Sequence, residues 1–254
     1  MINPFLKNLD KIEFVITDSC TGNCIHCSQG QHPGVSESIN AEIACECVEK
    51  ICSVYDIKTV MTFGGEPLLY PETVFSIMKT AKRMGVAKRQ VITNGYFSEN
   101  PEEIQNVARL LSECGVNEML LSVDAFHQKT IPLDVVKMFV KELKTAGVPV
   151  KLQPAWLVSP LDDNVYNRKT REILDSFWDL DIQEGEGNVV FPCGNALKYL
   201  SEFFTDTTVK NPCVEDPSDV RCVSFSPNGD VLYANVYERD IVTILDEYKP
   251  NIKI

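Results

Sequence analysis

The chain has 254 residues, of which 44% are hydrophobic and 24% are charged. This composition is ordinary for a globular protein, and the length suits one large core with a small appendage. The formal net charge of −12 argues against a nucleic-acid surface, which needs a basic face to displace counterions. The first residues form no basic-then-apolar signal peptide, and no apolar run approaches the roughly 18 residues of a membrane span. We therefore expect a cytoplasmic protein that binds neither nucleic acid nor a membrane.

Strand-like and helix-like segments alternate along most of the chain. The predicted strands are 12–17, 59–63, 90–93, 118–123, 150–157 and 189–191. The predicted helices are 40–55, 71–85, 100–115, 133–147, 164–178 and 197–204. Strands that alternate with helices pair in parallel through right-handed crossovers. The sequence therefore predicts an α/β fold in which six β/α units curl into a partial (β/α)6 TIM-like barrel.

The C-terminal part of the sequence has a different character. Residues 221–233 read as two short strands around Pro227-Asn228-Gly229-Asp230, because Asn-Gly between extended segments is a strong hairpin signal. A last helix is predicted at 240–248. We therefore expect a barrel core at 1–205 and a small hairpin-plus-helix extension at 206–254.

Three cysteines lie within eight residues on the loop after the first predicted strand, in the order Cys20-Thr-Gly-Asn-Cys24-Ile-His-Cys27. Loops at the C-terminal ends of parallel strands are where α/β proteins bind ligands. Structural zinc has four ligands, usually as two separated C-x2-C pairs, and the chain has no second pair. A single triad suits a four-iron cluster in which one iron lacks a protein ligand, because soft thiolates select iron-sulfur clusters.

A second motif, Gly64-Gly65-Glu66-Pro67, follows the next predicted strand. With the triad and the strand-helix alternation, it makes about residues 10–200 resemble a radical S-adenosylmethionine (SAM) enzyme. The resemblance implies that the open iron chelates the amino and carboxylate groups of SAM. The residue before the third cysteine is often aromatic in that family, whereas here it is His26, whose flat ring can also pack over the cluster.

The same resemblance assigns cofactor contacts to polar residues at successive strand ends. It implies that the backbone of Gly64 and Gly65 meets the SAM amino group, while Glu66 fixes the loop. The segments that resemble contacts to the SAM carboxylate and ribose are Thr93, Asn94, Ser122 and Asp124, with Gln153 at the corresponding height of the fifth strand. Taken alone, these residues are equally typical of turns and helix entries.

One histidine and three late cysteines stay open. His127 could donate a proton or bind substrate, since histidine titrates near neutrality, or it could be a loop histidine bonded to backbone. The segment that begins at Cys222 resembles a degenerate SPASM/twitch-like extension, the domain that binds an auxiliary cluster in many family members. The cysteine expected after the hairpin is absent, so Cys193, Cys213 and Cys222 could form a second iron-sulfur site or belong to a cluster-free remnant.

The leading hypothesis is a radical SAM enzyme that cleaves SAM reductively to a 5′-deoxyadenosyl radical and abstracts hydrogen from a peptide, protein or small-molecule substrate. The resemblance implies an electron donor such as flavodoxin or ferredoxin. One alternative is an activase of a glycyl-radical enzyme. Two others are a non-catalytic iron-sulfur protein for electron transfer or sensing, and a zinc-stabilised scaffold, although neither needs Gly-Gly-Glu-Pro, Ser122 or Asp124.

Overall fold

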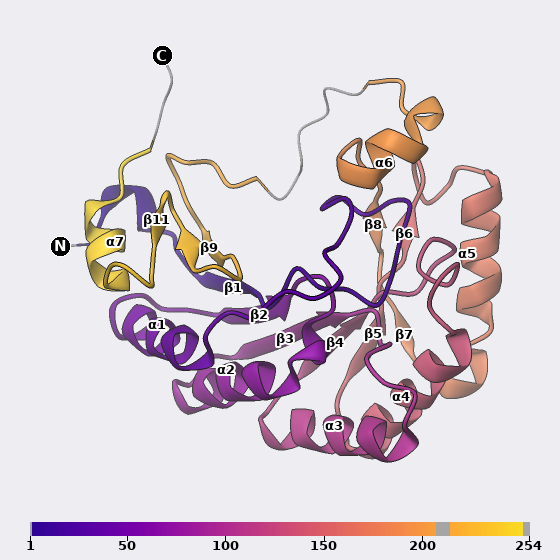
Figure 1. Ribbon diagram of the computed structural model, residues 1–254, viewed down its shortest axis with the longest axis horizontal. Coiled ribbons are helices and arrows are strands. Elements are labelled where there is room, and N and C mark those ends of the chain that lie inside the picture. The colour runs from indigo at the N-terminus through magenta and orange to yellow at the C-terminus, as the bar shows by residue number, and fades with distance from the viewer. Residues whose placement is uncertain (1, 207–213, 251–254) are drawn as a thin grey trace.

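The computed structural model describes residues 2–206 and 214–250. A parallel sheet of seven strands runs through its centre in the order β7-β5-β4-β3-β2-β1-β9. These strands are β1 (Lys11–Val15), β2 (Thr59–Phe63), β3 (Lys88–Thr93), β4 (Glu118–Leu121), β5 (Val150–Leu152), β7 (Gln183–Glu184) and β9 (Cys222–Phe225). Figure 1 shows the sheet curling past a row of helices on one side, so the predicted α/β partial barrel is confirmed.

The helices that alternate with these strands cover the outer face of the sheet (Figure 1). They are α1 (Ala41–Val54), α2 (Pro71–Arg83), α3 (Pro101–Glu113), α4 (Leu133–Thr145) and α5 (Val165–Asp175). Their first turns follow local signals: Asn40, Asn100 and Asn164 each accept a hydrogen bond from a backbone N–H of the helix that they precede. Short 3-10 turns lie at Pro4–Leu6, Pro67–Leu69, Trp178–Leu180 and Ser201–Phe203.

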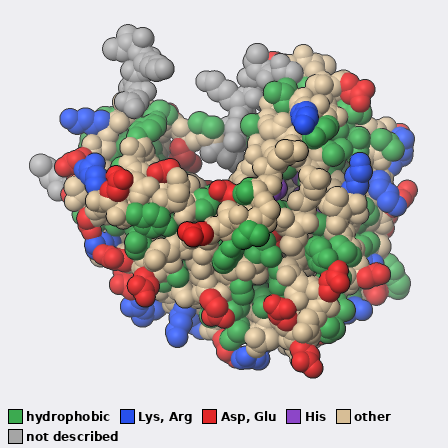
Figure 2. All heavy atoms as spheres, in the orientation of Figure 1, with side chains coloured by type: hydrophobic (Ala, Val, Ile, Leu, Met, Phe, Trp, Pro, Cys, Tyr) green, Lys and Arg blue, Asp and Glu red, His purple; other side chains and the backbone are tan. Residues whose placement is uncertain are grey.

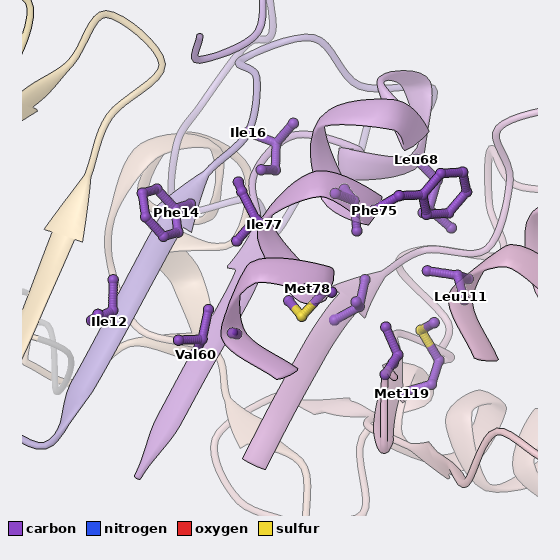
Figure 3. Close-up of a cluster of buried hydrophobic side chains, with 14 of the residues drawn as sticks. Ile12, Phe14, Ile16, Val60, Leu68, Phe75, Ile77, Met78, Leu111 and Met119 are labelled. Atoms are coloured by element: carbon purple, nitrogen blue, oxygen red, sulfur yellow. The ribbon is translucent and has the colours of Figure 1, made fainter. Parts of the chain in front are cut away.

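The hydrophobic core lies between the sheet and these helices. Alternate residues of β1, Ile12 and Phe14, are fully buried on this side, as the two-residue period of a strand requires. They meet the apolar stripe of α2, where Ile77 and Met78 are also fully buried (Figure 3). The opposite face of the sheet is the concave one, and it carries both apolar residues, such as Phe63 and Leu120, and polar ones.

The predicted fifth and sixth strands differ from the structure. The segment 150–157 divides into β5 and β6 (Ala155–Trp156), because Pro154 has no N–H to donate to a ladder. β6 pairs with β8 (Asn188–Val189) in a separate two-stranded ribbon. The strand that pairs with β5 in the main sheet is therefore β7, not the segment predicted at 189–191. β7 consists of two exposed polar residues, which gave no strand signal in the sequence.

Two helix boundaries also move. The helix predicted at 164–178 ends at Asp175, and the chain continues into the 3-10 turn at Trp178–Leu180. The helix predicted at 197–204 begins three residues earlier, as α6 (Gly194–Tyr199), and its second half is the 3-10 turn Ser201–Phe203. α6 stands above the β6–β8 ribbon in Figure 1.

The predicted C-terminal hairpin is wrong in its pairing. β9 does not pair with the next strand but joins the main sheet, parallel to β1. The hairpin forms farther along the chain than predicted, between β10 (Asp230–Val231) and β11 (Ala234–Asn235). Its turn residues Leu232 and Tyr233 have φ of 48° and 65°, which L-residues adopt at a cost. The last helix is α7 (Ile241–Glu247), close to the prediction.

No helix among residues 2–206 and 214–250 is both long enough and apolar enough to cross a membrane.

We predict that the C-terminal extension contributes to global stability through β9. Phe225 is fully buried and stacks on Phe14 of β1, with 4.8 Å between ring centroids. Phe225→Ala should lower the free energy of unfolding by about 3–5 kcal/mol, whereas Ser224→Ala, at the exposed neighbouring position, should change it by less than about 0.5 kcal/mol. Urea denaturation measures both, and equal effects would show that β9 is not docked.

Candidate functional site

A cavity of about 510 Å³ opens at the C-terminal ends of the strands, on the concave side of the sheet. It brings together most of the polar residues that the sequence singled out. Its lining includes Cys20, Cys24, Cys27, Gly64, Gly65, Thr93, Asn94, Ser122, Asp124, His127 and Gln153. Glu66 lies just behind this lining, fully buried. A larger, more open depression of about 950 Å³ beside Tyr70 and Tyr237 contains none of the cysteines.

Two glycines at the end of β2 bring its backbone against the cysteine loop. A Cβ on Gly65 would lie 2.0 Å from the carbonyl oxygen of Ser19, and one on Gly64 would lie 2.7 Å from that of Thr17. Gly64 also has φ of 152°, which strongly favours glycine. Two backbone hydrogen bonds join the end of β2 to the start of the cysteine loop, from Gly65 N to Thr17 O and from Glu66 N to Ser19 O, both 2.8 Å.

The carboxylate of Glu66 is a buried acceptor for the neighbouring strand end. It accepts hydrogen bonds from the Thr93 hydroxyl at 2.6 Å, from Asn94 N at 2.8 Å and from Leu68 N at 3.0 Å. Burial nevertheless raises the pKa of Glu66 to about 7, against the lowering effect of these donors. Glu66 therefore ties the ends of β2 and β3 together and does not face the cavity.

The three thiols belong to one electrostatic group. Burial raises the pKa of Cys20 to about 11 and raises that of Cys24 further. Burial would also raise the pKa of Cys27, but its hydrogen-bond contact with His32, with Sγ and Nε2 3.3 Å apart, and nearby amides lower it overall. Buried thiols with raised pKa values ionise when a metal compensates the charge.

The donor set of the loop consists of three thiols. Soft thiolates select iron–sulfur clusters, and three ligands leave one iron of a four-iron cluster without a protein ligand. Among the described residues, potential ligand atoms of His26, Asp124 and His127 also lie within 4.8 Å of one another. The donor set of the loop therefore suits a four-iron cluster.

Asn94 holds the first part of the cysteine loop from β3. Its side-chain N–H₂ donates to Thr21 Oγ1 at 3.1 Å and to Cys20 Sγ at 3.6 Å. The Asn94 side chain itself is almost fully buried. The structure thus places Thr93 and Asn94 in the cavity wall, with Thr93 bonded to Glu66 and Asn94 bonded to the loop.

Asp124 is saturated by hydrogen bonds within the chain. Its carboxylate accepts from the backbone of Phe126 and His127 at 2.9 Å, from Ala155 N at 3.0 Å and from His127 Nδ1 at 2.8 Å. Burial would raise its pKa, but His127 lowers it well below the usual range. Conversely, burial would lower the pKa of His127, but Asp124 raises it overall. Asp124 orients the histidine, whose ring lines the cavity.

His26 packs its ring against two other aromatic rings, and its place over a cluster stays a prediction. Its ring lies 4.7 Å from the rings of Phe126 and His127. Its Nδ1 is buried without a hydrogen-bond partner, and burial lowers the pKa to about 4. His26 is therefore neutral at neutral pH and acts as a flat packing surface beside the triad.

Sequence reasoning missed the residues that hold the other side of the cysteine loop. Asn195, in the first turn of α6, donates from its backbone to Cys27 O at 2.8 Å and from Nδ2 to Cys24 O and Gly30 O at 3.1 Å. A Cβ on Gly194 would lie 2.4 Å from Ser28 O. A glycine between a predicted strand and a helix is the one signal that could have indicated such a close approach.

Two of the late cysteines, Cys193 and Cys222, lie on separate elements. Cys193 precedes α6, beside the cysteine loop, whereas Cys222 begins β9. α6 and β9 lie apart from each other in Figure 1. Cys213 lies outside the described residues, so a second cluster stays a prediction.

Comparison with known proteins decides the family. The family model of the Radical SAM superfamily matches residues 14–191, more than half of the chain. The chain belongs to the Radical SAM superfamily. It is therefore an enzyme of a class that uses a [4Fe–4S] cluster and SAM. The cysteine donor set and the side-chain-free strand end at Gly64 and Gly65 both fit these groups.

Curated relatives of this radical SAM chain include GTP 3′,8-cyclases. The probable GTP 3′,8-cyclase of Saccharolobus islandicus (strain L.S.2.15 / Lassen #1) is 25% identical over 227 residues, which cover 83% of this chain and 69% of that protein. The GTP 3′,8-cyclase of Clostridium acetobutylicum is 25% identical over 212 residues, which cover 76% of this chain and 63% of that protein.

Solved radical SAM structures share the fold over nearly the whole chain. Native anSMEcpe with bound AdoMet superposes with a TM-score of 0.62 at 13% identity, covering 96% of this chain and 81% of that one. Streptococcus suis SuiB bound to S-adenosylmethionine gives a TM-score of 0.59 at 10% identity, covering 96% and 67%. At such identities the likeness establishes the fold alone.

We predict that Glu66 makes the stability of the protein depend on pH. Its folded-state pKa of about 7 exceeds the ordinary value of 4.5, so its contribution is full below about pH 4.5 and is lost as pH rises through 7, by up to about 1.4 kcal/mol per pH unit. Glu66→Gln should flatten the pH dependence of the urea midpoint in this window. Exposed Glu72→Gln is the control; equal slopes for wild type and Glu66→Gln would contradict the assignment.

We also predict that Asn195 is needed to retain a metal cluster. Asn195→Ala removes the side-chain donor that the carbonyls of Cys24 and Gly30 share, so iron retained after anaerobic reconstitution and desalting should fall, and iodoacetamide should alkylate the apo-protein thiols faster. Asn167→Ala is the matched control, because Asn167 is also buried and its Nδ2 donates to three backbone carbonyls away from the loop. Both should lose about 1–3 kcal/mol of stability, and equal iron loss would contradict a specific role.

Proposed function

We propose that the protein is a radical SAM enzyme that cleaves SAM reductively and abstracts a hydrogen atom from a substrate held in the same cavity. The observation that supports this most is the convergence of three unpaired thiols and the polar ends of five strands on one cavity. When bound, the cluster and SAM supply the reductive carbon–sulfur cleavage and the 5′-deoxyadenosyl radical. The protein binds, orients and shields them from water.

Each predicted site residue has a defined place in this proposal. Cys20, Cys24 and Cys27 ligate the cluster as thiolates. The backbone of Gly64 and Gly65 borders SAM, while Glu66 fixes the strand ends without touching it. Among the described residues, nothing hydrogen-bonds the side chains of Ser122 or Gln153, although both line the cavity. We assign them to the hydroxyl groups of the SAM ribose, as neutral donors and acceptors.

The Asp124–His127 pair holds a proton at the cavity wall. Because Nδ1 lies 2.8 Å from a carboxylate oxygen of Asp124, that nitrogen carries the hydrogen of the bond, and Nε2 is the ring nitrogen left for a ligand. Asp124 is thus a positioning residue in the proposal, and its role differs from the ribose contact that the sequence suggested. His127 is the residue through which a substrate would gain or lose a proton.

The proposed reaction needs an electron donor and a substrate. Superfamily membership implies a reductant, for which flavodoxin or ferredoxin is the candidate, and a substrate that is a peptide, protein or small molecule. GTP cyclisation is a second candidate, favoured by the 25% identity with the Saccharolobus islandicus relative. Activation of a glycyl-radical enzyme finds no support in these relatives.

We predict that SAM cleavage requires Cys24 specifically. The wild type, reconstituted with iron and sulfide under anaerobic conditions and supplied with dithionite, should form 5′-deoxyadenosine from SAM. Cys24→Ala removes one cluster ligand and should lower the rate by about a hundredfold or more, the upper end of the effect seen when a metal site is disturbed. Cys47→Ala, in the buried face of α1, is the control and should retain activity. Formation at equal rates in both variants would contradict the proposal.

A further inference from the structure

We propose that the substrate group admitted to this cavity is uncharged or cationic, and that the cavity excludes a nucleoside triphosphate. The inference rests on the proposed function and narrows its substrate class. It assigns this chain a substrate other than the GTP that the names of its 3′,8-cyclase relatives state. The evidence for it is the set of charged groups that line the cavity.

The cavity offers one permanent cation, and that cation is already paired. Among the described residues that line it, Lys11 is the only lysine or arginine. Its Nζ lies 2.5 Å from Glu13 Oε1, and both side chains are mostly covered, with exposed fractions of 32% and 19%. Both residues face the concave side of β1, opposite the core residues Ile12 and Phe14. The pair therefore presents no net charge to a ligand.

The histidines supply no unpaired positive charge either. His127 is bonded to the buried carboxylate of Asp124, so a proton on the ring is neutralised by that partner. His26 packs its ring against Phe126 and His127. His32 is occupied at both nitrogens, by Cys27 Sγ at 3.3 Å and by the Asp18 carbonyl oxygen at 2.8 Å.

Backbone N–H groups, which bind phosphate in many nucleotide sites, are also occupied here. Gly65 N and Glu66 N donate to the cysteine loop, Asn94 N donates to Glu66, and Gly95 N donates to Thr93 Oγ1. The N–H of Asp124 donates to the side chain of Gln128. These five N–H groups are therefore committed within the chain and are not available to a phosphate chain.

A triphosphate in this cavity would be a multiply charged anion without counter-charge. Proteins meet such anions with bidentate arginines, lysines or metal ions. Placing an unpaired charge in a partly buried site costs several kcal/mol. Acidic side chains, drawn red in Figure 2, and basic ones, drawn blue, are scattered over the visible face of the molecule. Within the cavity, the described lining offers an anionic substrate no unpaired counter-charge.

The remaining polar groups of the cavity lining favour a substrate that donates hydrogen bonds. Glu13 offers its second carboxylate oxygen, and Gln90 has its amide N–H₂ committed to Glu118, which leaves the side-chain carbonyl as an acceptor. Asn188, from β8, lines the cavity with no described side-chain partner. Carboxylate, amide carbonyl and neutral amide suit an amide, hydroxyl or ammonium group. We therefore assign the substrate class by this chemistry.

The test compares guanosine with Mg·GTP, which share base and ribose and differ in the phosphates. Binding to the reconstituted, SAM-loaded wild type is measured by equilibrium dialysis. GTP should bind about tenfold or more weakly than guanosine, or not saturate, because the phosphates meet no free cation. Glu13→Gln, which frees Lys11, should raise the affinity for GTP relative to that for guanosine, whereas exposed Glu42→Gln should leave this ratio unchanged.

The inference would be overturned if GTP bound as tightly as guanosine or more tightly and if Lys11→Met abolished that binding. Lys11 would then be the residue that binds the phosphates. The result is separate from the test of the proposed function. A chain that forms no 5′-deoxyadenosine fails the proposed function whatever it binds, whereas a chain that forms 5′-deoxyadenosine and holds GTP through Lys11 fails only this inference.

Discussion

The cysteine loop can bind a cluster because two backbones approach it more closely than side chains would allow. On one side, β2 ends in Gly64 and Gly65, and a Cβ on Gly65 would lie 2.0 Å from the Ser19 carbonyl. On the other side, Gly194 and Asn195 of α6 meet the carbonyls of Cys24, Cys27 and Ser28. The loop is thus held at both ends by elements far apart in the sequence.

Buried carboxylates reinforce this arrangement from below. Glu66 joins the ends of β2 and β3, and Asp124 joins the end of β4 to the segment that begins β6. Each is fully buried and each accepts several N–H or O–H donors, as a buried charge requires. Glu66 lies behind the cavity lining, whereas Asp124 is part of it, beside the neutral groups of Ser122 and Gln153.

Local signals predicted most of the core. The asparagine N-caps, the apolar stripes of α2 and α4 and the buried run of β1 each depend on residues close in the sequence, so strand and helix positions followed. Pairing between distant segments has no such signal. Nothing in residues 222–225 says that they join β1, and Leu232-Tyr233 carries no residue typical of a turn with positive φ. Pro154 was the one residue in the sequence that indicated an interruption of the fifth strand.

The site divides in the same way. Strand ends in a parallel sheet meet at one edge, so Thr93, Ser122 and Gln153 could be placed near the triad from order alone. The contacts of Asn195 could not, because they depend on how α6 packs over the loop. Nor could the saturation of Asp124, since its donors come both from the nearby residues Phe126 and His127 and from Ala155 at the start of β6.

The most direct test of the account is the iron content and electron paramagnetic resonance spectrum of the anaerobically reconstituted, dithionite-reduced protein, with and without SAM. The account predicts about four irons per chain, as one four-iron cluster requires, and a spectrum that changes when SAM is added, because one iron has no protein ligand. A protein that takes up no iron beyond a variant lacking all three loop cysteines, or whose spectrum SAM does not alter, would contradict it.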